Sequence, residues 1–164
     1  MTTYISQPGA PFPHLRRGVG QPPPQGVTLP MAYEWTEAMA TGDEAIDNEH
    51  RTLIAWINRL GEANEADRGE QEVMRVLNFL LTYARLHFAH EEGCFARARC
   101  PHAAANCKAH EQFIQHVMSV KSECEAHGVT EHRALELHRM LGEWLANHIL
   151  KVDTSLKPCL ESTN

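Results

Sequence analysis

Apolar residues recur at intervals of three or four over most of the chain from residue 43 to residue 150. This spacing places them on one face of an α-helix, whereas a half-buried strand would alternate apolar and polar residues. The pattern predicts helices at about residues 43–63, 70–94, 102–127 and 131–150. Because the connections between them are short, we expect an all-α fold, an antiparallel up-down four-helix bundle.

The ends of the predicted helices depend on residues that start or stop a helix. Gly93 and Pro101 bracket a break between the second and third helices, since proline disfavours continuing a preceding helix. Gly128 ends the third helix, and Thr130 is a suitable N-cap for the fourth. We expect residues 31–40 to lie across the bundle as an ordered arm and residues 155–164 to form a short tail.

The N-terminal segment has a different composition from the rest of the chain. Residues 1–30 contain seven of the nine prolines, several glycines and no apolar period. Such a composition predicts a disordered or polyproline-like Pro/Gly-rich tail, with a segment that docks on a partner as the alternative. The bundle is then expected to occupy residues 31–164.

Length, charge and cysteine content exclude several classes of protein. A chain of 164 residues suits one domain, and its net charge of −6 argues against nucleic-acid binding, which favours a basic face. No segment approaches the roughly 18 apolar residues of a membrane helix, so we expect no membrane insertion. The five cysteines form no C-x-x-C pair, which predicts reduced thiols and a cytoplasmic location.

Polar residues occupy positions inside the apolar stripes. His87 and Glu91 lie four residues apart on one face of the second helix, and that face continues toward the N-terminus as an apolar stripe. A bare carboxylate in such a stripe would be costly to bury, so either the stripe opens to water or a cation lies inside. Each predicted helix contributes at least one such residue, and the full set is His50, His87, Glu91, Asn106, His110, His148 and Asp153.

This set of side chains predicts a metal site in the bundle core. Imidazoles and carboxylates suit iron, manganese and zinc alike, and two carboxylates that can each bridge suit a pair of ions. The competing interpretation is a group of hydrogen-bonded core residues, as a single histidine in an apolar stripe usually is. His148 and Asp153 are five residues apart, so they can converge only from the two sides of the stripe or through a locally loosened turn.

The remaining histidines lie outside the predicted site. His14 belongs to the tail, and the others fall off the apolar stripes or at a helix end, so we expect them to be solvated: His90, His102, His116, His127, His132 and His138. The cysteines around position 100 could suggest a zinc site, but their spacing matches no standard zinc motif. We expect them to be small buried or half-exposed thiols.

At this point the residues resemble a known family, the hemerythrins, and specifically the single-domain bacterial type. The resemblance covers about residues 33–156. It rests on four motifs, Ile46-Asp47-x-x-His50, His87-Phe88-x-x-Glu91-Glu92, His110-x-x-Phe113 and Trp144-Leu145-x-x-His148-Ile149-x-x-x-Asp153. The five-residue step from His148 to Asp153 is the spacing found in this family.

The resemblance implies a non-heme pair of Fe ions, oxo- or hydroxo-bridged, and a pair with one site only partly filled is the alternative. The same resemblance implies that His50 and His87 hold one iron and that His110 and His148 hold the other. The carboxylates of Glu91 and Asp153 would bridge the two irons. An apolar surround would keep water out and slow autoxidation. The residues available for that wall are Ile54, Leu80, Leu81, Ile149 and Leu150.

The chain departs from the family pattern at one ligand. The family has His-x-x-x-His in the third helix, whereas this chain has Asn106 in the first of those positions and His110 in the second. The amide oxygen of Asn106 could ligate iron, though more weakly than imidazole, and a water could take the position instead. A thiolate ligand from the neighbouring Cys107 is a less favourable alternative.

The resemblance implies a protein that binds O2, or another small diatomic ligand, for oxygen carriage, storage or sensing. Delivery or storage is preferred to sensing because no signalling domain is attached. The alternative is a di-iron oxidase or peroxidase made reactive by the missing histidine at position 106. An iron store or a variant with one metal is a third possibility. We expect no separate catalytic residues, and a binding protein is favoured over an enzyme.

Overall fold

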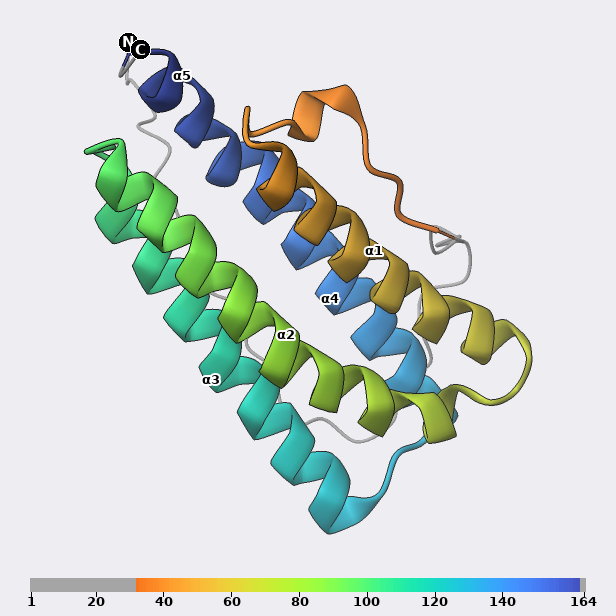
Figure 1. Ribbon diagram of the computed structural model, residues 1–164. Coiled ribbons are helices and arrows are strands. Elements are labelled where there is room, and N and C mark those ends of the chain that lie inside the picture. The colour runs from red at the N-terminus through yellow and green to blue at the C-terminus, as the bar shows by residue number, and fades with distance from the viewer. Residues whose placement is uncertain (1–31, 163–164) are drawn as a thin grey trace, which may run out of the picture.

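The computed structural model describes residues 32–162, and within them it confirms the all-α four-helix bundle. The long helices are α1 (Glu44–Glu65), α2 (Gly69–Arg97), α3 (Ala103–His127) and α4 (Glu131–Lys151). Their up-down order follows from the short turns between them (Figure 1). The tail predicted for residues 1–30 lies outside the described residues.

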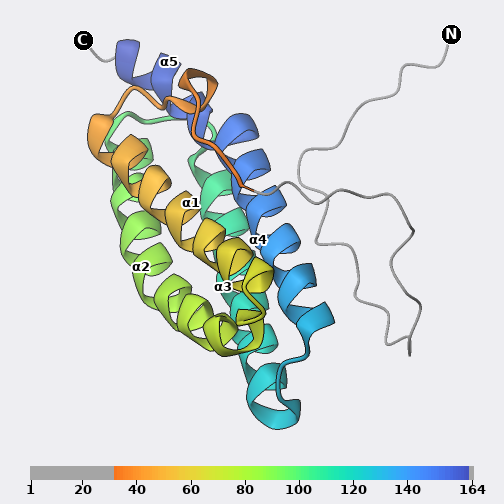
Figure 2. The same ribbon diagram turned by 90° about the vertical axis from the view of Figure 1, so that its right-hand side faces the viewer.

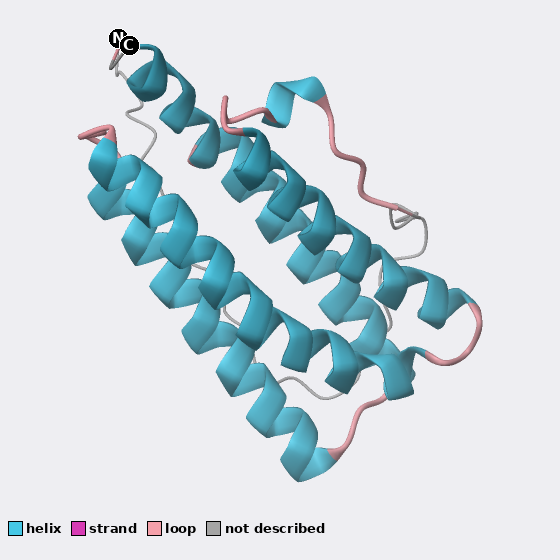
Figure 3. Ribbon diagram, viewed as in Figure 1, coloured by secondary structure: helices cyan, strands magenta, loops and turns pink. Residues whose placement is uncertain are grey.

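Neighbouring helices in the bundle bury one continuous core. α1 packs against α2 and α4, and α3 packs against α2, while α2 and α4 meet across the bundle. Every described residue is in a helix, a turn or a loop, and none is in a strand (Figure 3). The buried stripe residues predicted from the three-four spacing form this core, for example Leu53, Ile57, Leu77, Val117 and Leu141.

The chain before α1 is an ordered arm, as expected (Figure 2). The backbone N–H of Tyr33 donates to the side-chain oxygen of Asn58 on α1, and the Asn58 amide donates back to the Tyr33 carbonyl, both at 2.8 Å. The Tyr33 ring also lies against α4, where only a glycine fits: a Cβ on Gly142 would come within 1.9 Å of it. The arm includes a short 3-10 helix, η1 (Glu37–Met39).

Capping interactions explain where the helices begin. The Asp43 carboxylate accepts hydrogen bonds from the backbone N–H groups of Ala45 and Ile46, which are otherwise unpaired in a first helical turn. The Thr130 hydroxyl accepts from the N–H of Arg133 at 3.2 Å, so its predicted role as N-cap is confirmed. Gly128, with φ of +77°, ends α3.

The predicted end of α2 is wrong by several residues. The helix passes through Gly93 and continues to Arg97. A glycine within a helix costs only about 1 kcal/mol, and continuing the helix buries Cys94 and Phe95 in a second small core cluster. The break begins after Arg97, and Arg99 within it has a positive φ of 50°.

The C-terminal segment is also more ordered than the sequence predicted. Instead of a plain tail, a 3-10 helix η2 (Asp153–Ser155) leads into a short helix α5 (Leu156–Glu161), whose Leu156 is fully buried. Cys159 on α5 forms a disulfide with Cys100, so the expectation that all thiols are reduced is wrong for this pair. The two residues are 59 positions apart, and nothing in their spacing shows that the fold brings their Cα atoms to 5.5 Å.

No helix in the described part of the chain combines the length and the apolar character needed to cross a membrane.

Candidate metal centre

The six side chains predicted as metal ligands come together inside the bundle. All six are buried, and none is more than 6% exposed. They come from every long helix and from η2: His50 on α1, His87 and Glu91 on α2, His110 on α3, His148 on α4 and Asp153 on η2.

The donor atoms of these side chains form two groups that share one carboxylate. His50, His87 and Glu91 make the first group, and Glu91 joins His110, His148 and Asp153 in the second. Within each group the atoms lie within 4.8 Å of one another, a spacing that can accommodate one ion. The shared position of Glu91 links the two groups.

Both carboxylates are oriented toward both groups. One Asp153 oxygen lies 3.3 Å from Nε2 of His50 and the other lies 3.1 Å from Nε2 of His148. The Glu91 oxygens divide in the same way, with Oε1 at 3.9 Å from Nε2 of His50 and Oε2 at 3.2 Å from Nε2 of His110. Each carboxylate therefore has one oxygen for each group.

A local change of helix geometry brings Asp153 into the site. Five residues of regular helix would turn it about 140° away from His148. Regular α-helix instead ends at Lys151, and Val152 has φ of −118° and ψ of −61° before the 3-10 turn that carries Asp153. The loosened turn is thus the correct one of the two predicted alternatives.

Two further glutamates contact the imidazole nitrogens that face away from the centre. Oε2 of Glu49 lies 2.8 Å from Nδ1 of His87, and Oε1 of Glu92 lies 2.9 Å from Nδ1 of His110. When Nδ1–H donates to a carboxylate, the lone pair of Nε2 is left facing the centre of the bundle. Sequence reasoning missed both roles, because Glu49 and Glu92 lie off the apolar stripe, although each is adjacent to a predicted ligand.

Aromatic rings pack on two of the imidazoles. Phe88 stacks on His110 with ring centres 3.7 Å apart and planes tilted by 7°. Trp144 stacks on His148 at 4.5 Å and 11°, and Phe113 stacks on Trp144 at 4.0 Å. This packing limits rotation of both imidazoles and shields them from water.

Most of the inward-facing donor atoms have no hydrogen-bond partner. Among the described residues, the buried atoms left without one include Nε2 of His50, His110 and His148, Oε1 of Glu91 and both carboxylate oxygens of Asp153. Buried polar atoms are almost always paired, and leaving several unpaired together would cost several kcal/mol. Metal ions would satisfy these atoms at once, so the residues present fit a metal centre.

The pKa shifts point to the same need for positive charge. Burial and the nearby Asp153 raise the pKa of Glu91 to about 7. Burial alone would raise the pKa of Asp153 too, but His148 and His50 lower it below its ordinary value. The protein thus disfavours the charged form of Glu91, and a cation beside both carboxylates would favour the charged form of both.

The shifts of the histidines favour neutral, ligand-ready rings. Burial, with the charge of His148, lowers the pKa of His110 to about 4. Burial, with the charge of His50, lowers the pKa of His87 as well. Metal ligation requires a neutral imidazole. Because these two rings are already neutral near pH 7, they can bind metal without first releasing a proton.

Asn106 lies beside the centre and is fully buried. Its Nδ2 donates to Oε2 of Glu91 at 3.3 Å, while its Oδ1 is buried without a hydrogen-bond partner. The adjacent Cys107 is exposed, which removes support for a thiolate ligand.

Most of the predicted apolar wall is buried. Ile54, Leu80 and Ile149 are at most 6% exposed, and Leu81 is partly buried. Leu150 does not belong to the wall, because its side chain is 44% exposed.

The expected solvation of the other histidines holds only in part. His102, His127 and His132 are exposed, whereas His90 and His116 are partly buried with side-chain partners. His138 is only 3% exposed, so its prediction is wrong. The N-terminal arm covers this face of α4, with the Tyr33 ring edge-on to His138 at 5.6 Å, and helical spacing alone does not show such a cover.

Comparison with known proteins agrees with this geometry. Residues 41–160 match the hemerythrin HHE cation binding domain. The chain is 32% identical to a bacteriohemerythrin of Pseudomonas aeruginosa over 119 residues, which are 73% of this chain and 75% of that protein. It is 33% identical over 115 residues to a bacteriohemerythrin of Stenotrophomonas maltophilia, covering 70% and 72% of the two chains. A hemerythrin-like protein of Naegleria gruberi is 26% identical over 133 residues, covering 81% and 98%.

Proposed function

The chain belongs to the hemerythrin family, and we propose that it binds O2 reversibly at a non-heme di-iron centre, for oxygen carriage or storage or for sensing. The observation that carries the proposal is the pair of donor groups that share Glu91, with buried and unpaired donor atoms facing inward. Paired imidazoles with bridging carboxylates in a helical bundle are a common setting for two iron ions.

In this proposal the six predicted residues are the ligands. His50 and His87 would hold one iron, His110 and His148 the other, and Glu91 and Asp153 would contact both. An iron pair held there would supply the electrons that reversible O2 binding requires. The protein's own contribution is to orient the imidazoles through Glu49 and Glu92 and to exclude water with the buried residues around them.

A second candidate function is a di-iron oxidase or peroxidase, and Asn106 is the observation that favours it. A position without a third histidine is open to peroxide or substrate as well as to solvent. An iron store, or a centre with a single metal, is the third candidate, and it applies if the half with Asn106 does not retain its ion.

Anaerobic loading with Fe(II), a metal count and a visible spectrum distinguish these candidates. Reversible O2 binding predicts two irons per chain and an absorption band that appears with O2 and disappears when O2 is removed. Rapid irreversible oxidation accompanied by turnover of added peroxide would favour the enzyme. One iron per chain would contradict both proposals.

The domain limits and the location are also proposals. We propose that residues 31–164 form the folded unit, supported by the match at residues 41–160, and limited proteolysis should leave that fragment intact. The cytoplasmic location was expected from the cysteine pattern, yet the Cys100–Cys159 disulfide weakens that reasoning because disulfides are uncommon in reducing compartments. Cell fractionation tests it.

A further inference from the structure

The side chain at position 106 makes the two halves of the centre alike. With His50 and His87 on one side and His110 and His148 on the other, each half has two imidazoles and a share of both carboxylates. A third histidine at position 106 would have made the halves unequal. The question is whether the Asn106 amide takes the place of that ligand.

The hydrogen bond of Asn106 shows which end of its amide faces the carboxylate. A carboxylate only accepts hydrogen bonds, so the group that faces Oε2 of Glu91 at 3.3 Å is the NH2 group, which has no lone pair to give a metal. That same Glu91 oxygen lies 3.2 Å from Nε2 of His110, so it is the oxygen of the half with Asn106. The NH2 group of the amide therefore donates to a bridging carboxylate, and Oδ1, at the other end of the amide, is buried without a hydrogen-bond partner, so the experiment below tests whether it is a ligand.

We propose that Asn106 supports Glu91 and leaves a second coordination position open to a small neutral ligand, such as a diatomic molecule. This inference rests on the proposed di-iron function and deepens it, because it gives the centre one exogenous-ligand position in each half. Two such positions would allow both metals to take part in binding.

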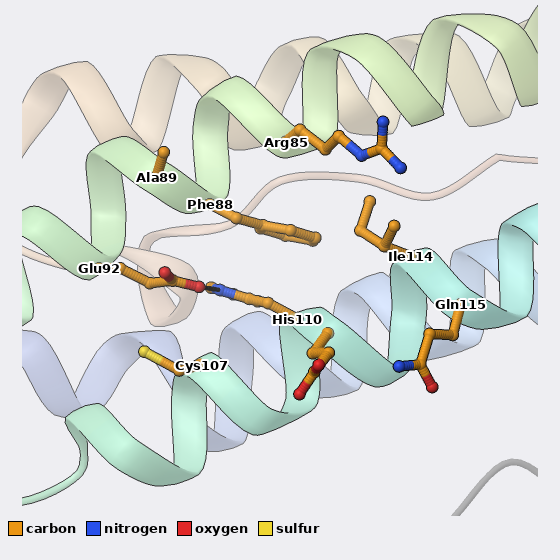
Figure 4. Close-up of a pocket in the computed structure, with 9 residues that line it drawn as sticks. Arg85, Phe88, Ala89, Glu92, Cys107, His110, Ile114 and Gln115 are labelled. Atoms are coloured by element: carbon orange, nitrogen blue, oxygen red, sulfur yellow. Dashed lines mark hydrogen bonds and ion pairs between the residues drawn. The ribbon is translucent and has the colours of Figure 1, made fainter.

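A groove on the surface borders this half of the centre and is the candidate route to it. It lies between α2 and α3 and has a volume of about 420 Å³ (Figure 4). The stacked rings of Phe88 and His110 form part of its wall, and Ala89 and Ile114 add apolar surface. The opening therefore reaches the ring of a proposed ligand on the side of α3 that also carries Asn106.

The charges around the groove favour a neutral ligand. Its polar residues include two carboxylates, Glu92 and Glu111, against one guanidinium, that of Arg85. One oxygen of Glu92 already accepts from Nδ1 of His110 at 2.9 Å. An anion would meet an excess of negative charge, whereas a small neutral molecule would meet mainly the apolar wall.

Nitric oxide titration of the anaerobic di-ferrous protein tests the open position. We expect the natural protein and Asn106→Ala to bind two NO per chain and Asn106→His to bind one, because only the imidazole fills the position. If the natural protein binds one NO and Asn106→Ala binds two, the amide oxygen is a ligand and the inference is overturned. One NO in all three proteins also overturns it. If the larger histidine does not fit at position 106, the NO stoichiometries of the natural protein and Asn106→Ala still test the inference.

The iron content of each sample is measured first, which separates this inference from the proposed function. Fewer than two irons per chain contradicts the proposed function itself. Two irons with a single NO contradicts only the second ligand position.

The groove is tested by a matched pair of substitutions on α2. Ala89→Phe fills the groove and should slow NO association severalfold without changing its stoichiometry. Ala96→Phe makes the same change at another exposed position of α2, away from the groove, and should leave the rate unchanged. Equal rates in the two variants would rule out the groove as the route.

Discussion

Glu92 acts on the proposed centre through a single hydrogen bond. Its carboxylate lies 2.9 Å from Nδ1 of His110, and the other nitrogen of that ring faces inward. A carboxylate in this position fixes both the tautomer and the orientation of the ring, and it raises the basicity of the ligating nitrogen. Individual residues outside the ligand set therefore contribute to metal affinity.

Replacing Glu92 by Gln should weaken metal binding on the His110 side by about 10- to 100-fold, the usual effect of losing such a partner. Competition with a chelator measures the affinity of each site. Glu111→Gln is the matched control. Glu111 lines the same groove, but among the described residues it forms no hydrogen bond with a proposed metal ligand. Equal affinities in the two variants would show that Glu92 does not position His110.

His138 should make stability depend on pH. Burial lowers the pKa of His138 in the folded protein below its ordinary value of 6.5, so below that pH the unfolded chain binds more protons. The stability contributed by the neutral ring is complete above pH 6.5 and is lost as the pH falls. Replacing His138 by Gln should therefore reduce the drop in Tm between pH 7.5 and pH 5.5. An unchanged drop would mean that His138 is not buried in its neutral form.

At the scale of elements, the three-four spacing was enough to predict the four long helices, because each must bury one apolar face. It could not predict that α2 passes through Gly93, since the energy of burying Phe95 comes from tertiary packing. It also could not predict α5 or the burial of His138, which depend on segments from elsewhere in the chain covering them.

Two glycines within helices should respond in opposite ways to alanine. A Cβ on Gly61 would lie 2.7 Å from Nε2 of His138, whose buried ring cannot easily move, so Gly61→Ala should destabilise the protein by about 1–3 kcal/mol. A Cβ on Gly93 would meet only the mobile end of Arg97, so Gly93→Ala should stabilise by about 0.5–1 kcal/mol. Urea denaturation measures both. A stabilising Gly61→Ala would contradict the packing of α1 on α4.

At the scale of the whole molecule, one covalent bond holds the C-terminal segment to the bundle. The Cys100–Cys159 disulfide joins the loop after α2 to α5, and η2 with Asp153 lies directly before α5. Register across the helices was sufficient to predict five of the six central residues, whereas Asp153 is out of register with His148 and is brought in by the loosened turn at Val152. The disulfide and the supporting glutamates were not predictable, because they depend on how the helices and the terminus are packed.

Removing the disulfide should lower the stability of the entire chain. Closing a loop of this length is worth about 4 kcal/mol in the chain-entropy account, so Cys159→Ser should lower Tm substantially. Cys107→Ser is the control, because Cys107 is exposed and forms no disulfide. If both variants have the same Tm as the natural protein, the Cys100–Cys159 bond does not form in solution.

The central claim is that two irons lie in the two donor groups joined by Glu91 and Asp153. Anomalous diffraction at the iron edge from crystals of the iron-loaded protein locates the ions directly. We expect two peaks, one between His50 and His87 and one between His110 and His148, with both carboxylates next to both peaks. A single peak, or a pair of peaks away from these side chains, would contradict it.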